Sequence, residues 1–358
     1  LIEMRQIGII TKLYFCQLFV CHLFANGDIH SLNDKKLQMS EIKDSYTFVM
    51  AGHIYGSHNS SIYPSASLLA NMNIFSEKDI EFMVLLGDIF QRSNEVEIQQ
   101  LKETFLNNLD YPVFNSAGNH DLEDRELYVK HFGKTYFSFE ISSELFVFLD
   151  SEENNGKIMD DQLEFIKNRI QIFESKMNIK NMFIFSHRLL WAIGNPPFDK
   201  IIDWVNGPAW HPEDALTVSE LIIPLLKRIK DKRVYFVSGD IGAGAFTIFY
   251  QNDINSNITY LATGLGDHEN DVVIKVRLDR DRNVLFSPIS LSGKRMELIQ
   301  NYDLNYWQGI LGHSTSIPIK FHQRLLNILL SKYFIIGSIF GSVGLLFCIT
   351  LFKRFIIY

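Results

Sequence analysis

Two short segments carry the residues of this chain whose types and spacing could do chemistry. Asp88 lies in the segment GDIF at 87–90, and Asn119 and His120 lie in the segment GNHD at 118–121. A carboxylate can bridge two divalent cations, an amide oxygen can complete a coordination shell, and an imidazole can exchange a proton near neutral pH. Together these groups predict metal-assisted hydrolysis of a phosphate ester.

The elements around these segments must bring them together. Residues 82–86 and 113–115 are short apolar runs that end in turn residues, which predicts buried strands, and residues 95–109 have helical apolar spacing. In a β-α-β unit of this kind, ligands bind beyond the carboxyl ends of the strands. Both segments are therefore expected at one crevice. The alternative is two strand-end turns, in which Gly allows the turn and Asp or Asn caps the next helix.

The ordered pair of segments resembles the calcineurin-like metallophosphoesterase superfamily, in which Gly-Asp-x-x and Gly-Asn-His-Asp follow successive strands. The resemblance implies an α/β fold with a central β-sandwich flanked by helices. It also implies that Asp88 bridges metal ions, that Asn119 contacts metal and substrate, and that His120 protonates the leaving oxygen. Asp121 is expected to hold the other nitrogen of His120, and it is also a candidate cap for a helix at 122–130.

The first and last motifs of this chain depart from the family pattern, which is Asp-x-His and Gly-His-x-His. By position, His53 stands where the family carries Asp, and Tyr55 stands where it carries His. Asp240 replaces the first late histidine and Gly242 the second. His187, which follows another apolar run, matches the middle histidine of the family.

Two explanations of these departures remain open. In one, carboxylate and imidazole are exchanged between His53 and Asp240, and two ions of Mn, Fe or Zn bind with help from water or from Asp267 and His268. Both residue types bind these metals, so the exchange preserves the charge of the shell. In the other, one ion is lost, and the site works with a single ion or not at all. The expected metal ligands are His53, Asp88, Asn119, His187 and Asp240.

Two further features bear on the substrate. The segment GDIFQR at 87–92 is similar to the Gly-Asp-x-x-Asp-Arg stretch of protein serine/threonine phosphatases, so Arg92 is expected to hold the substrate phosphate. A solvated surface arginine is the alternative. Residues 188–216 form a long insertion with three tryptophans directly after His187, and we expect it to cover the crevice. A loop packed on its own aromatic side chains is equally consistent with this composition.

Composition bounds the architecture. The chain has 358 residues, 47% of them hydrophobic, which suffices for one large α/β domain with appendages. It carries 34 Lys and Arg against 41 Asp and Glu, and the net charge of −7 gives no support to a nucleic-acid partner. The three cysteines, at 16, 21 and 348, fall outside the expected domain, so neither a disulfide nor a cysteine metal site is expected in it.

Patterning along the chain predicts a β-sandwich flanked by helices, because strands alternate with helices first and cluster later. Further strands are expected at 45–51, 136–140, 145–149, 181–185, 233–237, 246–250, 258–262, 272–278 and 284–287. Helices are expected at 160–173 and at 217–230. Thr217 and Glu220 resemble a capping box for the second helix, and Pro224 is expected to kink it.

Apolar runs near both ends predict an association with a membrane. Residues 13–25 follow a basic start and resemble a signal peptide, with a retained anchor as the alternative. Residues 333–352 carry no charge and are long enough to span a bilayer, and Lys353 and Arg354 favour a cytoplasmic tail. The expected order is a signal peptide or hydrophobic segment (1–26), a polar surface lead-in (27–44), the catalytic domain (45–300), a juxtamembrane segment (301–332), a transmembrane helix (333–352) and a short tail (353–358).

The sequence therefore predicts a single-pass membrane protein with a metal-dependent phosphoesterase domain on the extracytoplasmic side. A metal-activated hydroxide would attack a phosphomonoester or phosphodiester of a small molecule, a lipid or a protein. The small residues Gly337 and Gly341 give a face that could pair two membrane helices into a homodimer, and small residues are equally common in unpaired spans. The alternative, motivated by the ligands missing at Tyr55 and Gly242, is a catalytically silent domain that serves as a surface binding module.

Overall fold

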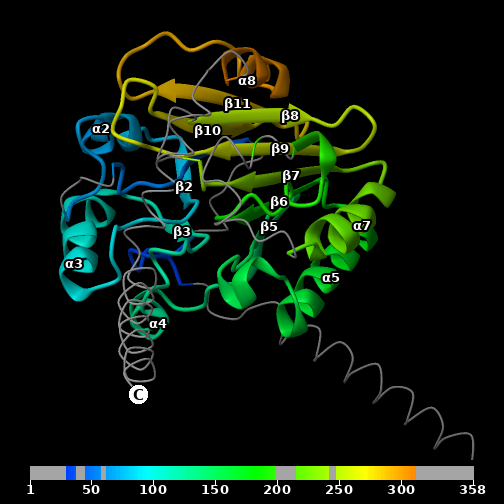
Figure 1. Cartoon of the computed structure of the whole chain (residues 1–358), viewed down its shortest axis with the longest axis horizontal. Coiled ribbons are helices and arrows are strands. Elements are labelled where there is room, and N and C mark those ends of the chain that lie inside the picture. Colours follow the sequence, from blue (N-terminus) through cyan, green and yellow to red (C-terminus); the bar gives the residue numbers. More distant parts are fainter. Residues whose placement is uncertain are drawn as a thin grey trace, which may run out of the picture. The chain divides into compact units, whose positions relative to one another are not determined.

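The structure, a computed structural model, describes part of the chain in detail (Figure 1). The described residues are 30–37, 45–57, 62–198, 201, 215–241 and 247–311. The predictions for the signal segment, the transmembrane helix with its Gly337 and Gly341, the cytoplasmic tail, Trp204, Trp210 and Gly242 fall outside them. The chain divides into two compact units, Leu1–Leu304 and Asn305–Tyr358, and every strand of the described residues lies in the first.

None of the helices in the described residues is long and apolar enough to cross a bilayer.

Two β-sheets packed face to face form the core of the first unit (Figure 1). The first sheet has the order β11 (Val284–Ser290), β10 (Val272–Leu278), β1 (Tyr46–Ala51), β2 (Ile80–Leu85) and β3 (Val113–Asn115). The second has the order β4 (Phe137–Ile141), β5 (Glu144–Phe148), β6 (Asn181–Ser186), β7 (Arg233–Ser238), β9 (Ile258–Thr263) and β8 (Ile248–Asn252). Strands β1, β2 and β3 are parallel, as are β5, β6, β7 and β9, so their carboxyl ends share an edge within each sheet.

The carboxyl edges of the two sheets meet at one rim. Gly239 follows β7 of the second sheet, and a Cβ atom added to it would lie 2.0 Å from the carbonyl oxygen of Leu86, which follows β2 of the first sheet. Only glycine allows this approach of the two backbones. Side chains that follow strands of either sheet can therefore contact one another.

Phenylalanine fills the space between the sheets. Phe48 of β1 stacks on Phe82 of β2, with 4.8 Å between ring centroids. It also meets Phe146 of β5 and Phe183 of β6 edge-on, at 5.6 and 5.4 Å. All four rings are fully buried, and the burial of each contributes about 1.5–3 kcal/mol to folding. The abundance of phenylalanine in the sequence thus reflects a core of interlocked rings.

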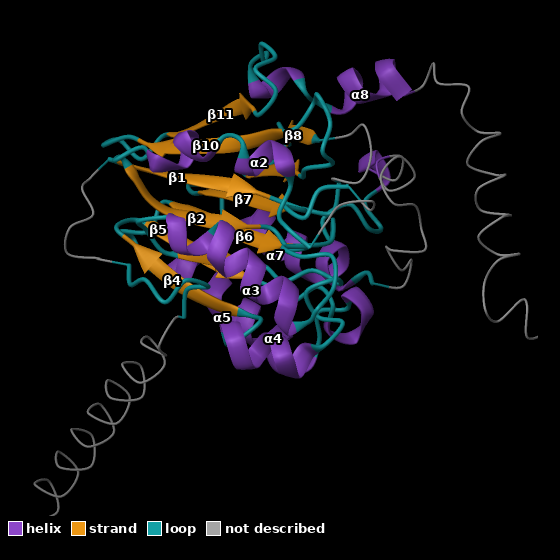
Figure 2. Cartoon of the chain, turned by 90° about the vertical axis from the view of Figure 1, so that its left-hand side faces the viewer, coloured by secondary structure: helices purple, strands orange, loops and turns teal. Residues whose placement is uncertain are grey.

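Helices cover the outer faces of the sandwich. The helices α2 (Ala66–Leu69), α3 (Glu95–Thr104) and α4 (Arg125–Phe132) pack on the outer face of the first sheet, which faces the viewer in Figure 2. The helices α5 (Asp160–Ser175) and α7 (Ile223–Arg228) lie on the side of the second sheet (Figure 1). The helix α8 (Leu304–Leu311) begins at the last residue of the first unit. Single turns of 3₁₀-helix occur at Met72–Ser76, Leu106–Asn108, Glu153–Gly156, Pro196–Phe198 and Ile299–Asn301, and a π-helix at Val218–Ile222.

The predicted α/β class and the predicted strands are confirmed, with strand ends displaced by a few residues. Two helix predictions were wrong in detail. The helix expected at 95–109 ends at Thr104 and continues only as a 3₁₀ turn. Thr217 has helical backbone angles and no capping bond, so no capping box forms there. Because Pro224 lacks the N–H of a regular helical bond, the chain forms a wider π-turn before α7 begins.

The predicted cap on the helix after the GNHD segment was also wrong. α4 begins at Arg125, and its cap is Asp124, whose carboxylate accepts the N–H of Leu127 at 2.9 Å. Asp121 lies one turn earlier and is fully buried, where it has other partners. A short turn therefore separates the candidate catalytic segment from the helix.

The predicted surface lead-in at 27–44 is partly buried. Leu32 is 3% exposed, and its N–H donates to the carbonyl of Val113 at the edge of β3. The side chain of Asn33 donates to the carbonyl of Tyr111 at 2.9 Å. Residues 31–33 thus cover the edge strand of the first sheet, which would otherwise present unpaired backbone groups.

The capping role of Asp124 can be tested by stability. We expect Asp124→Ala to lower the free energy of unfolding by about 1 kcal/mol, because the N–H of Leu127 loses its acceptor. Urea unfolding followed by circular dichroism measures the change. Lys134→Ala, at an exposed position outside the helix, is the control and should be nearly neutral. An equal effect of both substitutions contradicts the cap.

Candidate functional site

Four ionisable side chains meet at the rim where the two sheets join. His53 follows β1 and Asp88 follows β2 in the first sheet, while His187 follows β6 and Asp240 follows β7 in the second. Their exposed fractions are 2%, 2%, 0% and 4%. Ionisable groups are rarely buried so completely unless they are paired or bind a ligand. The structure thus brings together four of the five side chains that sequence reasoning proposed as metal ligands.

Asp88 occupies the centre of this group. Its Oδ2 lies 3.3 Å from Nε2 of His187 and 3.8 Å from Nε2 of His53. Its Oδ1 accepts the backbone N–H of His120 at 3.1 Å. Asp240 extends the group, with its Oδ1 3.9 Å from Nε2 of His187. One carboxylate oxygen of Asp88 therefore faces two imidazole rings that come from different sheets.

Backbone carbonyls fix how both imidazole rings point. Nδ1 of His53 lies 2.9 Å from the carbonyl oxygen of Leu265, and Nδ1 of His187 lies 2.8 Å from that of Leu86. A carbonyl only accepts, so each Nδ1 carries the hydrogen and each Nε2 turns toward Asp88. In the described part of the chain, Nε2 of His187 is buried without a hydrogen-bond partner. Metal-binding histidines show this arrangement, with one ring nitrogen held by a carbonyl and the other turned to the ion.

Opposite charges offset the burial of these groups. Burial alone would raise the pKa of Asp88, but the imidazoles of His187 and His53 hold that pKa well below its usual range. Burial likewise opposes charge on His187, yet the carboxylates of Asp88 and Asp240 raise its pKa well above the usual value. Burial lowers the pKa of His53 to about 4, so that ring is neutral. A proton on His187 thus offsets one of the two carboxylate charges, and metal ions bind by displacing such protons.

Backbone strain is concentrated at two of the four residues. His53 has a φ of 52° and Asp88 a φ of 54°, in the left-handed region that side chains with a Cβ rarely adopt. Such residues cost about 1–3 kcal/mol each and persist where the surrounding structure holds them. Asp88 is held by the adjacent loop, because a Cβ atom on Gly118 would lie 2.3 Å from its Oδ1. Strain of this kind is typical of functional sites.

Asp121 holds that loop in place. Its carboxylate accepts the backbone N–H of Asp88 at 3.0 Å and those of Ile89 and Gly118 at 2.8 Å each. Burial and then the charge of Asp88 raise the pKa of Asp121 to about 6. The predicted contact between Asp121 and the ring of His120 was therefore wrong, since backbone donors occupy this carboxylate.

His120 has other partners, and one of them is Tyr55. Nδ1 of His120 lies 2.7 Å from the carbonyl oxygen of Gln91, and its Nε2 lies 3.4 Å from the hydroxyl of Tyr55. The ring of Tyr55 also packs on His53, with 4.2 Å between centroids. Burial and the carboxylates of Asp88 and Asp240 raise the pKa of Tyr55 well above its usual value. Tyr55 is thus a neutral phenol that contacts His120 and carries no charge to offer a metal.

Two proposed substrate contacts, Asn119 and Arg92, form no hydrogen bond or ion pair with the buried group in the described residues. Asn119 is half-buried in the loop after β3, and its side chain makes no hydrogen bond to another described residue. The side chain of Arg92 is exposed, while its backbone N–H donates to Glu97 at 2.9 Å and its carbonyl accepts from the side chain of Asn94 at 3.4 Å. Both side chains remain available to a ligand, and Asn119 lies between Gly118 and His120, which both approach Oδ1 of Asp88.

The suggestion that Asp267 helps to bind a second ion stays a prediction, and in the structure its carboxylate has protein partners. Its carboxylate accepts the hydroxyl of Ser65 at 2.6 Å and the backbone N–H of Ser57 at 3.2 Å. These bonds fix the loop that follows β1. His268 is partly exposed, with its Nδ1 3.5 Å from Asp271.

A buried ion pair beside the site escaped sequence reasoning. Nε of Arg188 lies 2.9 Å from each carboxylate oxygen of Glu152, and the two side chains are 9% and 6% exposed. The backbone N–H of Arg188 also donates to the hydroxyl of Ser151 at 3.1 Å. Because Arg188 follows His187 directly, the pair fixes the turn that presents that histidine. The only signal in the sequence was a charged residue adjoining His187.

The insertion at 188–216 begins in the core and not over the crevice. Residues 189–193 are buried, and the indole N–H of Trp191 donates to the hydroxyl of Ser238 at 3.0 Å. The same ring stacks on Phe249 with 5.4 Å between centroids. These residues pack in the core, and the cover over the crevice stays a prediction because most of the remaining insertion lies outside the described residues.

The four buried side chains fit a metal ion in type and orientation, although they do not form a closed site. No group of three or more His, Cys, Asp or Glu side chains in the described ranges is arranged so that it could hold a metal ion. Two donors that share an ion at about 2.1 Å each lie about 3.0–3.5 Å apart. The 3.3 Å between Asp88 and His187 meets this condition, whereas the 3.8 Å to His53 and 3.9 Å to Asp240 are slightly too long.

Comparisons with known proteins give a family match. The family model described as calcineurin-like phosphoesterase matches residues 24–214. A comparison with curated proteins found no significant match. Similar solved structures include the purple acid phosphatase from seeds of yellow lupin (Lupinus luteus), at 12% identity and a TM-score of 0.46, covering 71% of this chain and 53% of that protein. The Vps29 protein of Chaetomium thermophilum shows 10% identity and a TM-score of 0.28, over 71% of this chain and 97% of that one. This chain thus spans about half the length of the lupin protein.

The role of the buried ion pair can be tested by removing its acid. We expect Glu152→Ala to lower the free energy of unfolding by about 3–5 kcal/mol, because the buried guanidinium of Arg188 loses the carboxylate that pairs with it. Glu164→Ala is the matched control, since Glu164 forms an exposed pair with Lys167 and should cost under about 1 kcal/mol. Denaturant unfolding of both variants measures the difference. Equal small losses would show that the Arg188 pair does not stabilise the fold.

Proposed function

Since this chain belongs to the calcineurin-like phosphoesterase family, we propose that it is a metal-dependent phosphoesterase with its centre at Asp88. The resemblance read from the GDIF and GNHD segments is confirmed by the family match. One observation supports the proposal that the metal centre lies at Asp88. Nε2 of His53 and Nε2 of His187, each with its Nδ1 on a carbonyl, face the same oxygen of Asp88 from opposite sheets.

The donor set favours a single divalent ion of Mn, Fe or Zn. His53, Asp88, His187 and Asp240 supply donors in the number that one such ion takes from a protein. Tyr55 stands where the family has a further histidine, and as a neutral phenol it is a poor substitute. The carboxylate of Asp267 is held by serine donors. A second ion would then have to rely on Asn119 and on water.

In this proposal different residues of the chain have different roles in hydrolysis. A divalent ion, when bound, polarises the phosphoryl group and acidifies water. Asp88 and the two histidines hold the ion, and Asp121 fixes the loop that carries Asn119 and His120. His120 directs its Nε2 away from the carbonyl of Gln91 and can hold a proton there for the leaving oxygen. Tyr55 lies beside that nitrogen and limits the rotation of the ring.

Membrane attachment and substrate belong to the same proposal. The twenty residues at 333–352 carry no charge, and Lys332, Lys353 and Arg354 flank them, which supports a single membrane span with the catalytic domain on the extracytoplasmic side. Gly337 and Gly341 support pairing of such spans. The substrate would be a phosphorylated small molecule, lipid or protein, with Arg92 available to bind its phosphate.

A silent binding module is the second candidate function. It is favoured by one observation, that the described side chains around Asp88 are not closed into a metal site. Replacement of the family histidine by Tyr55 points the same way. Under this function the fold would be retained as a surface for partners, and the proton on His187 would offset one of the two buried carboxylate charges.

Removal of the Asp88 charge separates these functions. We expect the full-length protein to hydrolyse an aryl phosphate or a bis-aryl phosphate in the presence of Mn, Fe or Zn. Asp88→Asn should lower turnover by at least about 100-fold, because the substitution keeps the shape of the side chain and removes its negative charge. Asp110→Asn, at a fully exposed carboxylate, is the control and should retain full activity. Unchanged turnover in Asp88→Asn would refute the assignment, and no turnover in any protein would favour the silent module.

Metal content gives a second test. Elemental analysis of the purified protein should find one transition-metal ion per chain, and His187→Ala should lower that content to near zero. The reason is that Nε2 of His187 is buried without a hydrogen-bond partner in the described chain and lies between the carboxylates of Asp88 and Asp240. His131→Ala, which removes an exposed ion pair with Glu95, is the control. Two ions per chain would contradict the single-ion site, and a metal-free active enzyme would contradict metal dependence.

A further inference from the structure

A cavity lies at the end of the strands opposite to the proposed metal ligands, which are His53, Asp88, His187 and Asp240. Its volume is about 360 Å³, which is within the range of ordinary small-molecule sites, about 300–1,000 Å³. Arg233, the first residue of β7, lines it, whereas Asp240 lies just beyond the last residue of the same strand. At about 3.3 Å per residue the two positions are roughly 20 Å apart. The cavity is therefore separate from the proposed catalytic centre.

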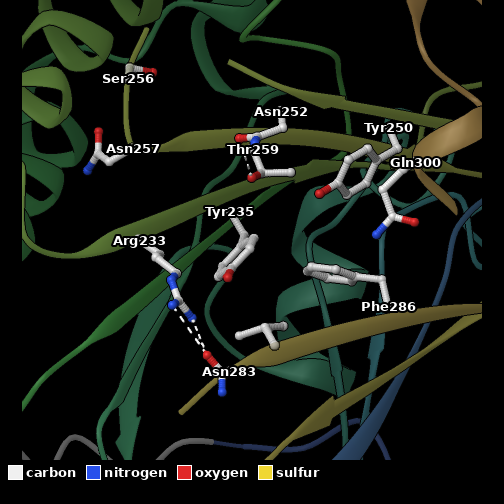
Figure 3. Close-up of a pocket in the computed structure, with 11 residues that line it drawn as sticks. Arg233, Tyr235, Tyr250, Asn252, Ser256, Asn257, Thr259, Asn283, Phe286 and Gln300 are labelled. Carbon is white, nitrogen blue, oxygen red and sulfur yellow. Dashed lines mark hydrogen bonds between the residues drawn. The ribbon is translucent and has the colours of Figure 1, made fainter. Parts of the chain in front are cut away.

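The lining of the cavity combines one cation with neutral polar groups and aromatic rings (Figure 3). The residues that matter for recognition are Arg233, Tyr235, Tyr250, Asn283, Phe286 and Gln300. Among the described residues that line the cavity, none is Asp or Glu. Hydroxyl and carboxamide groups both donate and accept hydrogen bonds, as the hydroxyls of a sugar do. The lining therefore suits a polyhydroxylated ligand without a positive charge.

Arg233 supplies the charge of the cavity. Its Nη1 and Nη2 each lie 3.3 Å from Oδ1 of Asn283, and Nη1 lies 3.4 Å from the carbonyl oxygen of Arg282. It forms no ion pair with a carboxylate of the described residues, and the neighbouring Asp279 bonds to Asn283 instead. Neutral acceptors thus orient the guanidinium of this exposed residue, and no carboxylate of the described residues pairs with it directly. A planar fork of donors matches the two oxygens of a carboxylate.

Aromatic rings form the apolar wall. Tyr235 and Phe286 are each 6% exposed, and their ring centroids lie 5.2 Å apart. Tyr250 lies 6.3 Å from Phe286, and its hydroxyl and the carboxamide of Gln300 are on the same side of the cavity as the Phe286 ring (Figure 3). Burial raises the pKa of Tyr235 to about 12 and raises that of Tyr250, so both phenols remain donors. An apolar ring flanked by such donors can contact both the C–H face and the hydroxyls of one sugar ring.

We propose that this cavity binds an acidic sugar, a hexuronate residue. Its carboxylate would pair with Arg233, its hydroxyls would bond to Tyr250 and Gln300, and its ring would lie on Phe286. A neutral hexose would make the same ring and hydroxyl contacts but would lack the charge-assisted pair with Arg233. A simple carboxylate such as acetate would satisfy Arg233 alone.

The comparison of three ligands tests the chemistry. Full-length protein is titrated with glucuronate, glucose and acetate, and binding is measured by calorimetry and by saturation-transfer NMR. We expect glucuronate to bind at least about tenfold more tightly than either of the others, because it alone joins a charge-assisted pair to the hydroxyl contacts. Absence of glucuronate binding overturns the proposal. Equal affinity for glucuronate and glucose, or for glucuronate and acetate, also overturns it.

Variants then place the ligand in this cavity. Arg233→Gln should weaken glucuronate binding at least about tenfold and leave the weak glucose affinity unchanged. Tyr250→Phe keeps the ring and removes one hydroxyl, so it should weaken both sugars. Arg277→Gln, at an exposed arginine on β10 that does not line the cavity, is the matched control and should bind normally. Unchanged affinity in Arg233→Gln, or an equal loss in Arg277→Gln, refutes the assignment.

A variant of the proposed catalytic centre tests whether the cavity and that centre are independent. Asp88→Asn should bind glucuronate as the wild-type protein does, since it changes the other end of the strands. If the phosphoesterase assignment fails, this binding is unaffected. If glucuronate binding is lost in Asp88→Asn, the two sites are not separate and the proposal fails.

Discussion

The burial of the Asp88 carboxylate between two imidazoles is the interaction on which the rest of the site depends. A carboxylate deprived of water is costly unless other groups replace its solvation. Here one oxygen receives the backbone N–H of His120, and the other faces His53 and His187. The second of these rings comes from the other sheet. The charge of a single side chain therefore couples the packing of the two sheets to the chemistry of their shared rim.

This coupling is possible because backbone segments that follow strands of the two sheets approach each other closely. With Gly239 touching Leu86 and Gly118 touching Asp88, the carboxyl ends of strands from both sheets come within side-chain reach. The left-handed backbone of Asp88 would be unfavourable alone, and Asp121 stabilises it by accepting three backbone N–H groups of the two loops. Hydrogen bonds of the folded protein thus offset the unfavourable backbone conformation of Asp88. The phenylalanine core between the sheets keeps these loops at a fixed separation.

The strands and four of the buried groups were predictable because local patterns report them. Apolar runs that end in Gly-Asp or in His place a polar residue at the carboxyl end of a strand, and parallel pairing then collects those residues at one rim. The partner of Asp121 was not predictable, because the choice between the ring of His120 and the N–H of Ile89 depends on a turn about thirty residues away. The pairing of Arg188 with Glu152 and the neutral state of Tyr55 likewise arise from tertiary packing. The cavity around Arg233 joins the amino ends of strands that carry no motif.

The balance of charge in the site explains why a carboxylate and an imidazole can be exchanged between positions 53 and 240. Each sheet now contributes one imidazole and one carboxylate, His53 with Asp88 and His187 with Asp240. With both rings neutral, the two carboxylates give the buried group a formal charge of −2, which one divalent cation neutralises. A second cation would leave an excess of positive charge that only an anionic substrate or hydroxide could offset. In the absence of a cation, the raised pKa of His187 retains a proton that supplies half of the compensation. The single ion that we propose would therefore compete with the proton on His187 for the same carboxylates.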